Sequence, residues 1–124
     1  MTEVEFLRHD GVEKEIVALE RRFRTIRDGL ARFELLCRKQ FDPVSPQQVI
    51  APAKLHRVHQ NDLWSLWKAE LVIPRSGLRP NQWPRLWFGV KGAIIVFLCI
   101  GSHVDNYRDV EMDKRALSRL GDVF

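Results

Sequence analysis

The chain has 124 residues, a length that corresponds to one domain over residues 1–124 with one hydrophobic core. Hydrophobic residues make up 45% of it and charged residues 29%, which is typical of globular proteins and excludes a disordered chain. The longest apolar run, Ala93 to Ile100, is far shorter than the ~20 residues of a membrane helix. The N-terminus has no secretory signal pattern, and Cys37 and Cys99 lie in apolar surroundings. We therefore expect a cytoplasmic protein with buried free thiols.

Positive charge is concentrated in residues 54–91. This segment holds seven Lys or Arg residues against Asp62 and Glu70, a net charge of +5. A field of this sign attracts phosphates or an acidic partner. The alternative is a solvated basic face without a ligand.

The first 41 residues predict a strand followed by two helices. Apolar and charged residues alternate over residues 3–8, as in a strand. Asp10 and Glu13 form a capping-box pattern, and apolar residues then recur at helical spacing up to Phe23. A second helix, capped by Thr25, follows almost at once. We expect a tight helix hairpin with one joint apolar face against a sheet.

The rest of the chain predicts three strands and a last helix. Prolines exclude regular structure from residues 42–52. The expected strands are Leu63 to Ile73, Arg85 to Val90 and Ala93 to Ile100, and the last helix runs from about Arg108 to Leu120, where Gly121 ends it. The strand Ala93 to Ile100 is apolar on both faces, so it should be covered on both or lie at a barrel-like bend. The predicted fold class is α+β, in the order β-α-α-β-β-β-α, with the helix hairpin on a small antiparallel sheet.

Four short motifs follow one another along this order. They are Lys54-Leu55-His56, Leu63-Trp64-x-Leu66, Pro84-Arg85-Leu86-Trp87-Phe88, and the apolar strand Ile94 to Ile100 with a polar segment that ends in Tyr107. Taken together, they resemble the RelE/ParE superfamily of bacterial toxins, and the first is similar to the "KLH" of its HigB-type (host inhibition of growth) branch. The resemblance covers almost the whole chain.

The resemblance implies a RelE-like fold and the toxin of a type II toxin–antitoxin module. Its function would be that of an mRNA endoribonuclease, or mRNA interferase, that acts on messenger bound to the ribosome and is neutralised by a cognate antitoxin protein. No cofactor or metal is implied, because the 2′-hydroxyl of the RNA attacks the adjacent phosphate. Such a reaction needs a proton acceptor, cations for the phosphoryl oxygens and an acid for the leaving oxygen. A homodimer or a toxin–antitoxin hetero-oligomer is also compatible with it.

The resemblance also assigns roles to individual residues. His56 would act as general base or acid, and Arg85 would bind the phosphate, although an ion pair with Glu70 on the neighbouring strand is an alternative. His103 and Tyr107 would complete the active site; alternatively, this segment only caps and underlies the last helix. The further candidates for RNA binding are Lys54, His59, Lys68, Arg75 and Arg79.

Two other functions compete with RNA cleavage. The ParE branch of the same superfamily inhibits DNA gyrase without catalysis, and the fold alone does not separate the two activities. Histidines, which titrate near neutrality, favour cleavage. A metal site could form from His56-x-x-His59 with His103-x-Asp105, but no cysteine pair supports it and the i,i+3 spacing suits a helix better than a strand.

The tryptophans and two arginines of the last helix have two interpretations each. The four tryptophans could stack on RNA bases, but we expect at least Trp67 and Trp87 to lie in the core or against a partner. Arg115 and Arg119 share one face of the last helix and could hold RNA or dock the antitoxin.

Overall fold

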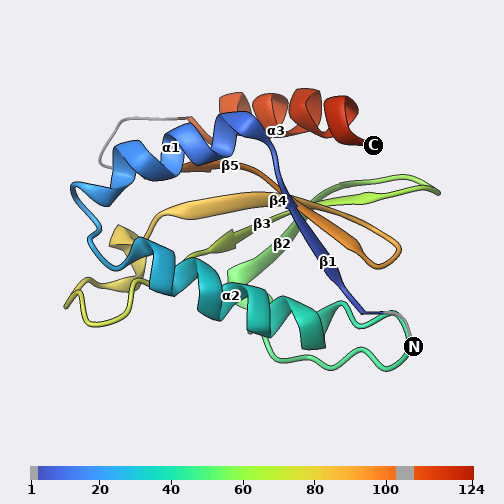
Figure 1. Ribbon diagram of the computed structural model, residues 1–124, viewed down its shortest axis with the longest axis horizontal. Coiled ribbons are helices and arrows are strands. Elements are labelled where there is room, and N and C mark those ends of the chain that lie inside the picture. Colours follow the sequence, from blue (N-terminus) through green and yellow to red (C-terminus); the bar gives the residue numbers. More distant parts are fainter. Residues whose placement is uncertain (1–2, 103–107) are drawn as a thin grey trace.

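A five-stranded sheet forms the centre of the molecule, with helices on both of its faces (Figure 1). This α+β arrangement is seen in a computed structural model that describes residues 3–102 and 108–124. The elements are β1 (Glu5–Arg8), α1 (Asp10–Glu20), α2 (Ile26–Gln40), β2 (Leu55–Gln60), β3 (Ser65–Glu70), β4 (Arg85–Lys91), β5 (Ile94–Gly101) and α3 (Asp109–Val123), with short 3-10 helices at Pro52–Lys54 and Pro80–Gln82. Within the described ranges, no helix is long and apolar enough to cross a membrane.

The sheet is mixed, whereas the sequence predicts an antiparallel one. The strand order is β1-β5-β4-β3-β2, and every neighbouring pair is antiparallel except β1 and β5. These two strands pair in parallel, with Glu5 opposite Ile94. Glu5 and Ile94 are 89 positions apart in the sequence, so no hairpin turn dictates the direction of the two strands.

The predicted element order also lacks one strand, β2, at the edge of the sheet. Its residues include two histidines and an arginine, and a register shift between Arg57 and His59 interrupts its pairing with β3. Such a polar edge strand gives a weak alternation signal. The hairpin between β2 and β3 is closed by Asn61, whose Oδ1 accepts hydrogen bonds from the backbone N–H groups of Leu63 and Trp64. This turn shortens the predicted strand Leu63 to Ile73.

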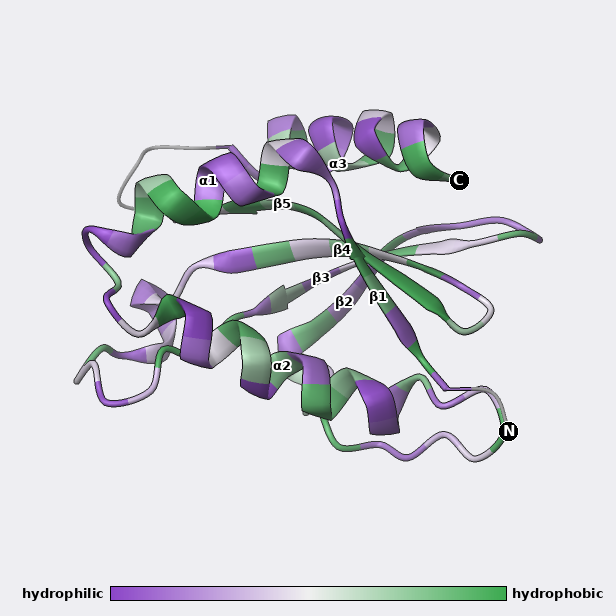
Figure 2. Cartoon of the chain, viewed as in Figure 1, coloured by the Kyte–Doolittle hydropathy of each residue, from purple (hydrophilic) through white to green (hydrophobic). Residues whose placement is uncertain are grey.

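Two hydrophobic cores lie on opposite faces of the sheet. The helix-pair core joins α1 and α2 to residues such as Phe88 and Phe97, and the α3 core joins α3 to Trp87, Val96 and Leu98. Strand β5 contributes to both and is apolar along almost its whole length (Figure 2). The structure therefore confirms that this strand is covered on both faces.

The ends of α1 and α2 differ from the predicted capping. His9, not Asp10, is the N-cap of α1, and its Nδ1 accepts a hydrogen bond from the backbone N–H of Gly11 at 3.0 Å. Thr25 precedes α2 as predicted, but its hydroxyl donates to the carbonyl oxygen of Pro74 at 2.6 Å and caps nothing. The hydroxyl therefore ties the start of α2 to the segment after β3.

Helix α3 continues past Gly121, where the sequence predicts its end, and reaches Val123. The following residue, Phe124, packs against the α3 core, so tertiary contact outweighs the low helix propensity of glycine. The predicted turn between β4 and β5 does form. Gly92 has a φ of +58°, a conformation that glycine adopts without steric cost.

Candidate functional site

The predicted His56 and Arg85 lie on one face of the sheet. His56 is opposite Lys68 across β2 and β3, Lys68 is opposite Trp87 across β3 and β4, and Glu70 is opposite Arg85. Directly opposed residues share a face, and so do alternate residues along a strand. All five side chains are therefore on the face that carries the α3 core, because Trp87 belongs to that core.

A shallow hollow of about 10 Å³ opens beside the part of this face that α3 covers. It is lined by His56, Lys68, Ala69, Glu70 and Arg85, and we call it the β2–β4 hollow. His56 is exposed, whereas Lys68, Glu70 and Arg85 are partly buried. The hollow thus gathers an imidazole, a carboxylate, an ammonium and a guanidinium, which are the groups that bind anions and transfer protons.

Two carboxylates of α3 pair with the cations of the hollow. Asp109 Oδ2 lies 2.6 Å from Arg85 Nη1 and 3.4 Å from Lys68 Nζ. Asp113 Oδ1 lies 3.9 Å from Lys68 Nζ and accepts a hydrogen bond from Trp87 Nε1 at 2.7 Å. The side chains of Lys68 and Arg85 are only 19% and 29% exposed, so these contacts are better shielded than ordinary surface ion pairs.

The predicted alternative for Arg85, an ion pair with Glu70, does not form, because Asp109 holds the guanidinium instead. In the ranges that the structure describes, the Glu70 carboxylate has no cation within 4 Å. It borders the same hollow as His56, so a carboxylate and an imidazole are both available there for proton transfer. From the sequence, Glu70 is expected only as a partner for Arg85, and Asp109 and Asp113 are not expected at the site. The i,i+4 spacing of the two aspartates at the start of a helix is the signal that could have pointed to them.

His59 extends the polar face toward the β2–β3 turn. After the register shift it pairs with Leu66, one alternate position, or about 7 Å, along β3 from Lys68. Its ring lies 5.4 Å from that of Trp64, at an interplanar angle of 46°. His59 and Trp64 therefore form an aromatic pair on the same face as the hollow.

The remaining predicted RNA-binding residues are spread over other parts of the molecule. Lys54 Nζ lies 5.1 Å from the centre of the Trp83 ring. Arg75 pairs with Asp28 of α2 at 2.7 Å, on the side of the helix pair, and Arg79 is exposed in the loop between β3 and β4. The predicted His103 and Tyr107, with Asp105 of the metal hypothesis, lie outside the described residues.

Two tryptophans and two arginines that could bind RNA or a partner make contacts within the molecule. Trp87 is fully buried, and Trp67 packs against Phe41 in the helix-pair core, so both tryptophans are core residues as expected. Glu15 of α1 binds both Arg119 and Arg115, at 2.9 and 3.2 Å, and the Arg115 side chain is 50% exposed. These arginines anchor α3 to α1.

Both cysteines are buried free thiols, as predicted. Burial raises the pKa of Cys37 above its ordinary range and that of Cys99 to about 12. Cys99 lies opposite Trp87, under α3. Burial therefore keeps both thiols protonated near neutral pH.

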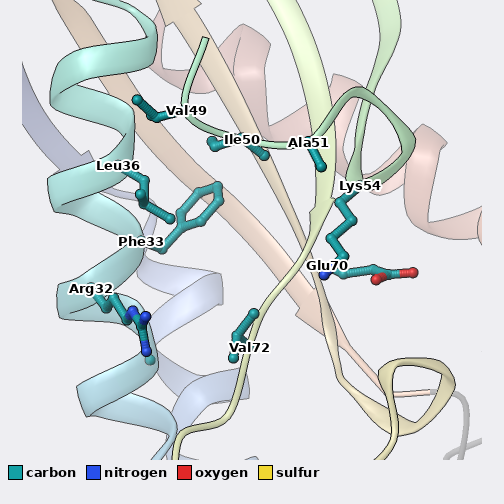
Figure 3. A pocket seen from close by; sticks show the side chains of 10 residues that line it. Arg32, Phe33, Leu36, Val49, Ile50, Ala51, Lys54, Glu70 and Val72 are labelled. Atoms are coloured by element: carbon teal, nitrogen blue, oxygen red, sulfur yellow. The ribbon is translucent and has the colours of Figure 1, made fainter. Parts of the chain in front are cut away.

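A second hollow, of about 260 Å³, lies between α2 and the segment around Ile50, and Glu70 borders both hollows (Figure 3). Phe33 and Leu36 extend into it from α2, and Val72 faces them from the chain beyond β3. Its lining is mainly apolar, with Lys54 at its rim. Of the residues that the structure describes, no histidine lines this second hollow, whereas His56, Lys68 and Arg85 line the β2–β4 hollow. The β2–β4 hollow is therefore the candidate site for binding and reaction of a phosphate.

In residues 3–102 and 108–124, no three His, Cys, Asp or Glu side chains are grouped as metal ligands. Comparison with known proteins identifies no relative: no family model, no curated protein and no solved structure matches the chain. The assignment of a function therefore depends on the residues of the site.

Proposed function

We propose that this chain is a metal-independent endoribonuclease of the RelE type, the toxin of a type II toxin–antitoxin module, which cuts messenger RNA on the ribosome. The observation that carries the proposal is the shared hollow of His56, Lys68, Glu70 and Arg85, built from three adjacent strands. The chain resembles that toxin family in four motifs, two of which contain His56 and Arg85. Its partners would be messenger RNA and a cognate antitoxin, in the cytoplasm.

The proposed reaction divides the work among the groups of the hollow. The 2′-hydroxyl of one nucleotide attacks the adjacent phosphorus, and the bond to the 5′-oxygen of the next nucleotide breaks. The products are a cyclic phosphate and a 5′-hydroxyl. His56 and Glu70 are the two proton-transfer groups: one accepts the proton of the 2′-hydroxyl, and the other protonates the leaving oxygen. Arg85 and Lys68 stabilise the negative charge that grows on the phosphoryl oxygens.

The His59–Trp64 pair would support this chemistry by holding a base. Stacking of a nucleobase on an aromatic side chain is worth ~1–3 kcal/mol. The pair lies about 7 Å along β3 from Lys68, on the face that also carries the hollow. A nucleotide next to the scissile phosphate would be positioned there.

A variant comparison tests the proposal. Arg85→Ala and His56→Ala should each abolish growth inhibition in cells and cleavage of messenger RNA, because each removes a group from the hollow. Arg57→Ala is the control. Like Arg85→Ala it removes one positive charge, and like His56→Ala it changes β2. Arg57 lies on the other face of the sheet, over Trp67. We expect this control to retain both effects.

Mapping of 5′ ends in cellular transcripts after induced expression gives the decisive measurement. New cuts within messages that depend on Arg85 and His56 support the proposal. Growth inhibition with supercoiling defects and without cuts would replace it with the gyrase-inhibitor alternative. Equal toxicity of the Arg85→Ala variant and the parent chain would remove Arg85 from the site.

A further inference from the structure

Asp109 binds the two cations that border the β2–β4 hollow, Arg85 and Lys68. A single oxygen of this carboxylate, Oδ2, contacts both Arg85 Nη1 and Lys68 Nζ. Carboxylates and phosphates are bound by the same charge-assisted donors. An RNA phosphate that binds these two cations competes with Asp109 for the same donors, and the negative charge of Asp109 repels it.

The helix that carries Asp109 is held unevenly along its length. Its later turns are buried through Ala116 and Leu120, and Arg119 donates to the carbonyl oxygen of Leu98 at 2.7 Å. At its start, the N-cap Arg108 makes no side-chain capping hydrogen bond, and Val110 is 64% exposed. Among the described residues, the start of the helix is therefore less buried than its later turns, and a helix end can open while the rest of the helix stays in place.

The contacts of the first turn of α3 are mainly polar. Asp109 pairs with Arg85 and Lys68, and Asp113, one turn further, accepts the indole N–H of Trp87. Met112 is the buried apolar residue of this part of the helix. An anion that binds Arg85 and Lys68 more strongly than Asp109 does would therefore move the first turn away from these cations.

We propose that the first turn of α3 is an internal competitor for the RNA phosphate. Asp109 holds Arg85 and Lys68 in the free protein, and RNA enters the hollow by displacing this carboxylate while the later turns of α3 remain packed. The inference rests on the proposed function for the identity of the ligand, but the competition itself applies to any phosphate. A partner that presses the first turn onto the sheet would inhibit binding, and one that lifts it would promote binding.

The test compares Asp109→Asn with Glu111→Gln. Both variants remove one negative charge from the first turn of α3, but Glu111 is exposed and forms no ion pair with the hollow. The probes are a short single-stranded RNA with 2′-O-methyl groups, which cannot be cleaved, and inorganic phosphate. RNA binding is measured by fluorescence anisotropy, and phosphate binding by the NMR shift of the Trp87 indole N–H. Circular dichroism establishes that each variant is folded.

We expect Asp109→Asn to bind both probes about tenfold more tightly than the parent chain, and Glu111→Gln to change binding by less than about twofold. Equal gains in the two variants would overturn the inference, since they would reflect net charge alone. It would also be overturned if Asp109→Asn bound neither probe better than the parent chain. If Asp109→Asn gained affinity for phosphate while no variant bound RNA, the competition would stand and the proposed nuclease function would fail.

Discussion

Replacement of Leu120 by alanine should separate the packing of α3 from its charge contacts. Leu120 is fully buried in the α3 core, and its Cδ1 fills the space next to Gly89, where a β-carbon on the glycine would lie only 2.4 Å away. The backbone at Gly89 is part of β4 in the middle of the sheet and cannot move in to fill the void. Leu120→Ala should therefore cost about 3–4 kcal/mol, the middle of the range for buried leucines.

Urea unfolding followed by circular dichroism measures this loss. With a slope of ~1–3 kcal/mol per molar urea, the midpoint should fall by at least about 1 M at unchanged slope. Leu117→Ala is the control on the same helix, because Leu117 is 43% exposed. Its cost should stay below about 1 kcal/mol, since alanine has the higher helix propensity. Equal losses in the two variants, or a loss below about 1 kcal/mol for Leu120→Ala, would refute the packing of α3 on β4.

Three further predictions concern the scaffold. Gly92→Ala should lower the free energy of unfolding by about 1 kcal/mol, because the residue has a φ of +58°; a melt that matches the parent chain would contradict this. Hydrogen bonds from neighbouring arginines, Arg27 foremost, lower the pKa of Glu13 below its ordinary value of 4.5. Its stabilising contribution should therefore be present above pH 4.5 and be lost as the pH falls through the lowered pKa. The difference in stability between the parent chain and Glu13→Gln should disappear over that range and stay constant at neutral pH. Finally, neither cysteine should react with a thiol reagent at pH 8 in the folded protein, and both should react in denaturant, as a spectrophotometric titration would show.

The helices and the central strands are predictable because their patterns are long. In α2 the apolar residues recur at helical spacing, so only a helix with one buried face covers them. In β5 they occupy both faces of the strand, so the strand must be covered on both sides. Strand β2 escapes prediction because an exposed edge strand needs no apolar face. The parallel pairing of β1 with β5 escapes it because the contact joins segments 89 positions apart, and no local pattern encodes such a contact.

The site is predictable only in part. His56 and Arg85 are identified from short motifs, and the structure places both beside one hollow. The role of Asp109 depends on the crossing of α3 over the sheet, which brings it to Arg85 from a distant part of the chain. Charge alone predicts the basic character of residues 54–91, but it does not predict which of those cations are already paired within the molecule.

The parallel pairing of β1 with β5 also affects how the protein forms during translation. The first strand has no partner in the sheet until the ribosome has made Ile94 and the residues after it. Until then, α1 and α2 lack much of the surface that covers their apolar faces, since that surface includes β4 and β5. A nascent chain in this state exposes hydrophobic side chains to chaperones and to other nascent chains. The last third of the sequence thus determines when the first third can fold, and truncation before β5 should give an aggregating product instead of a smaller domain.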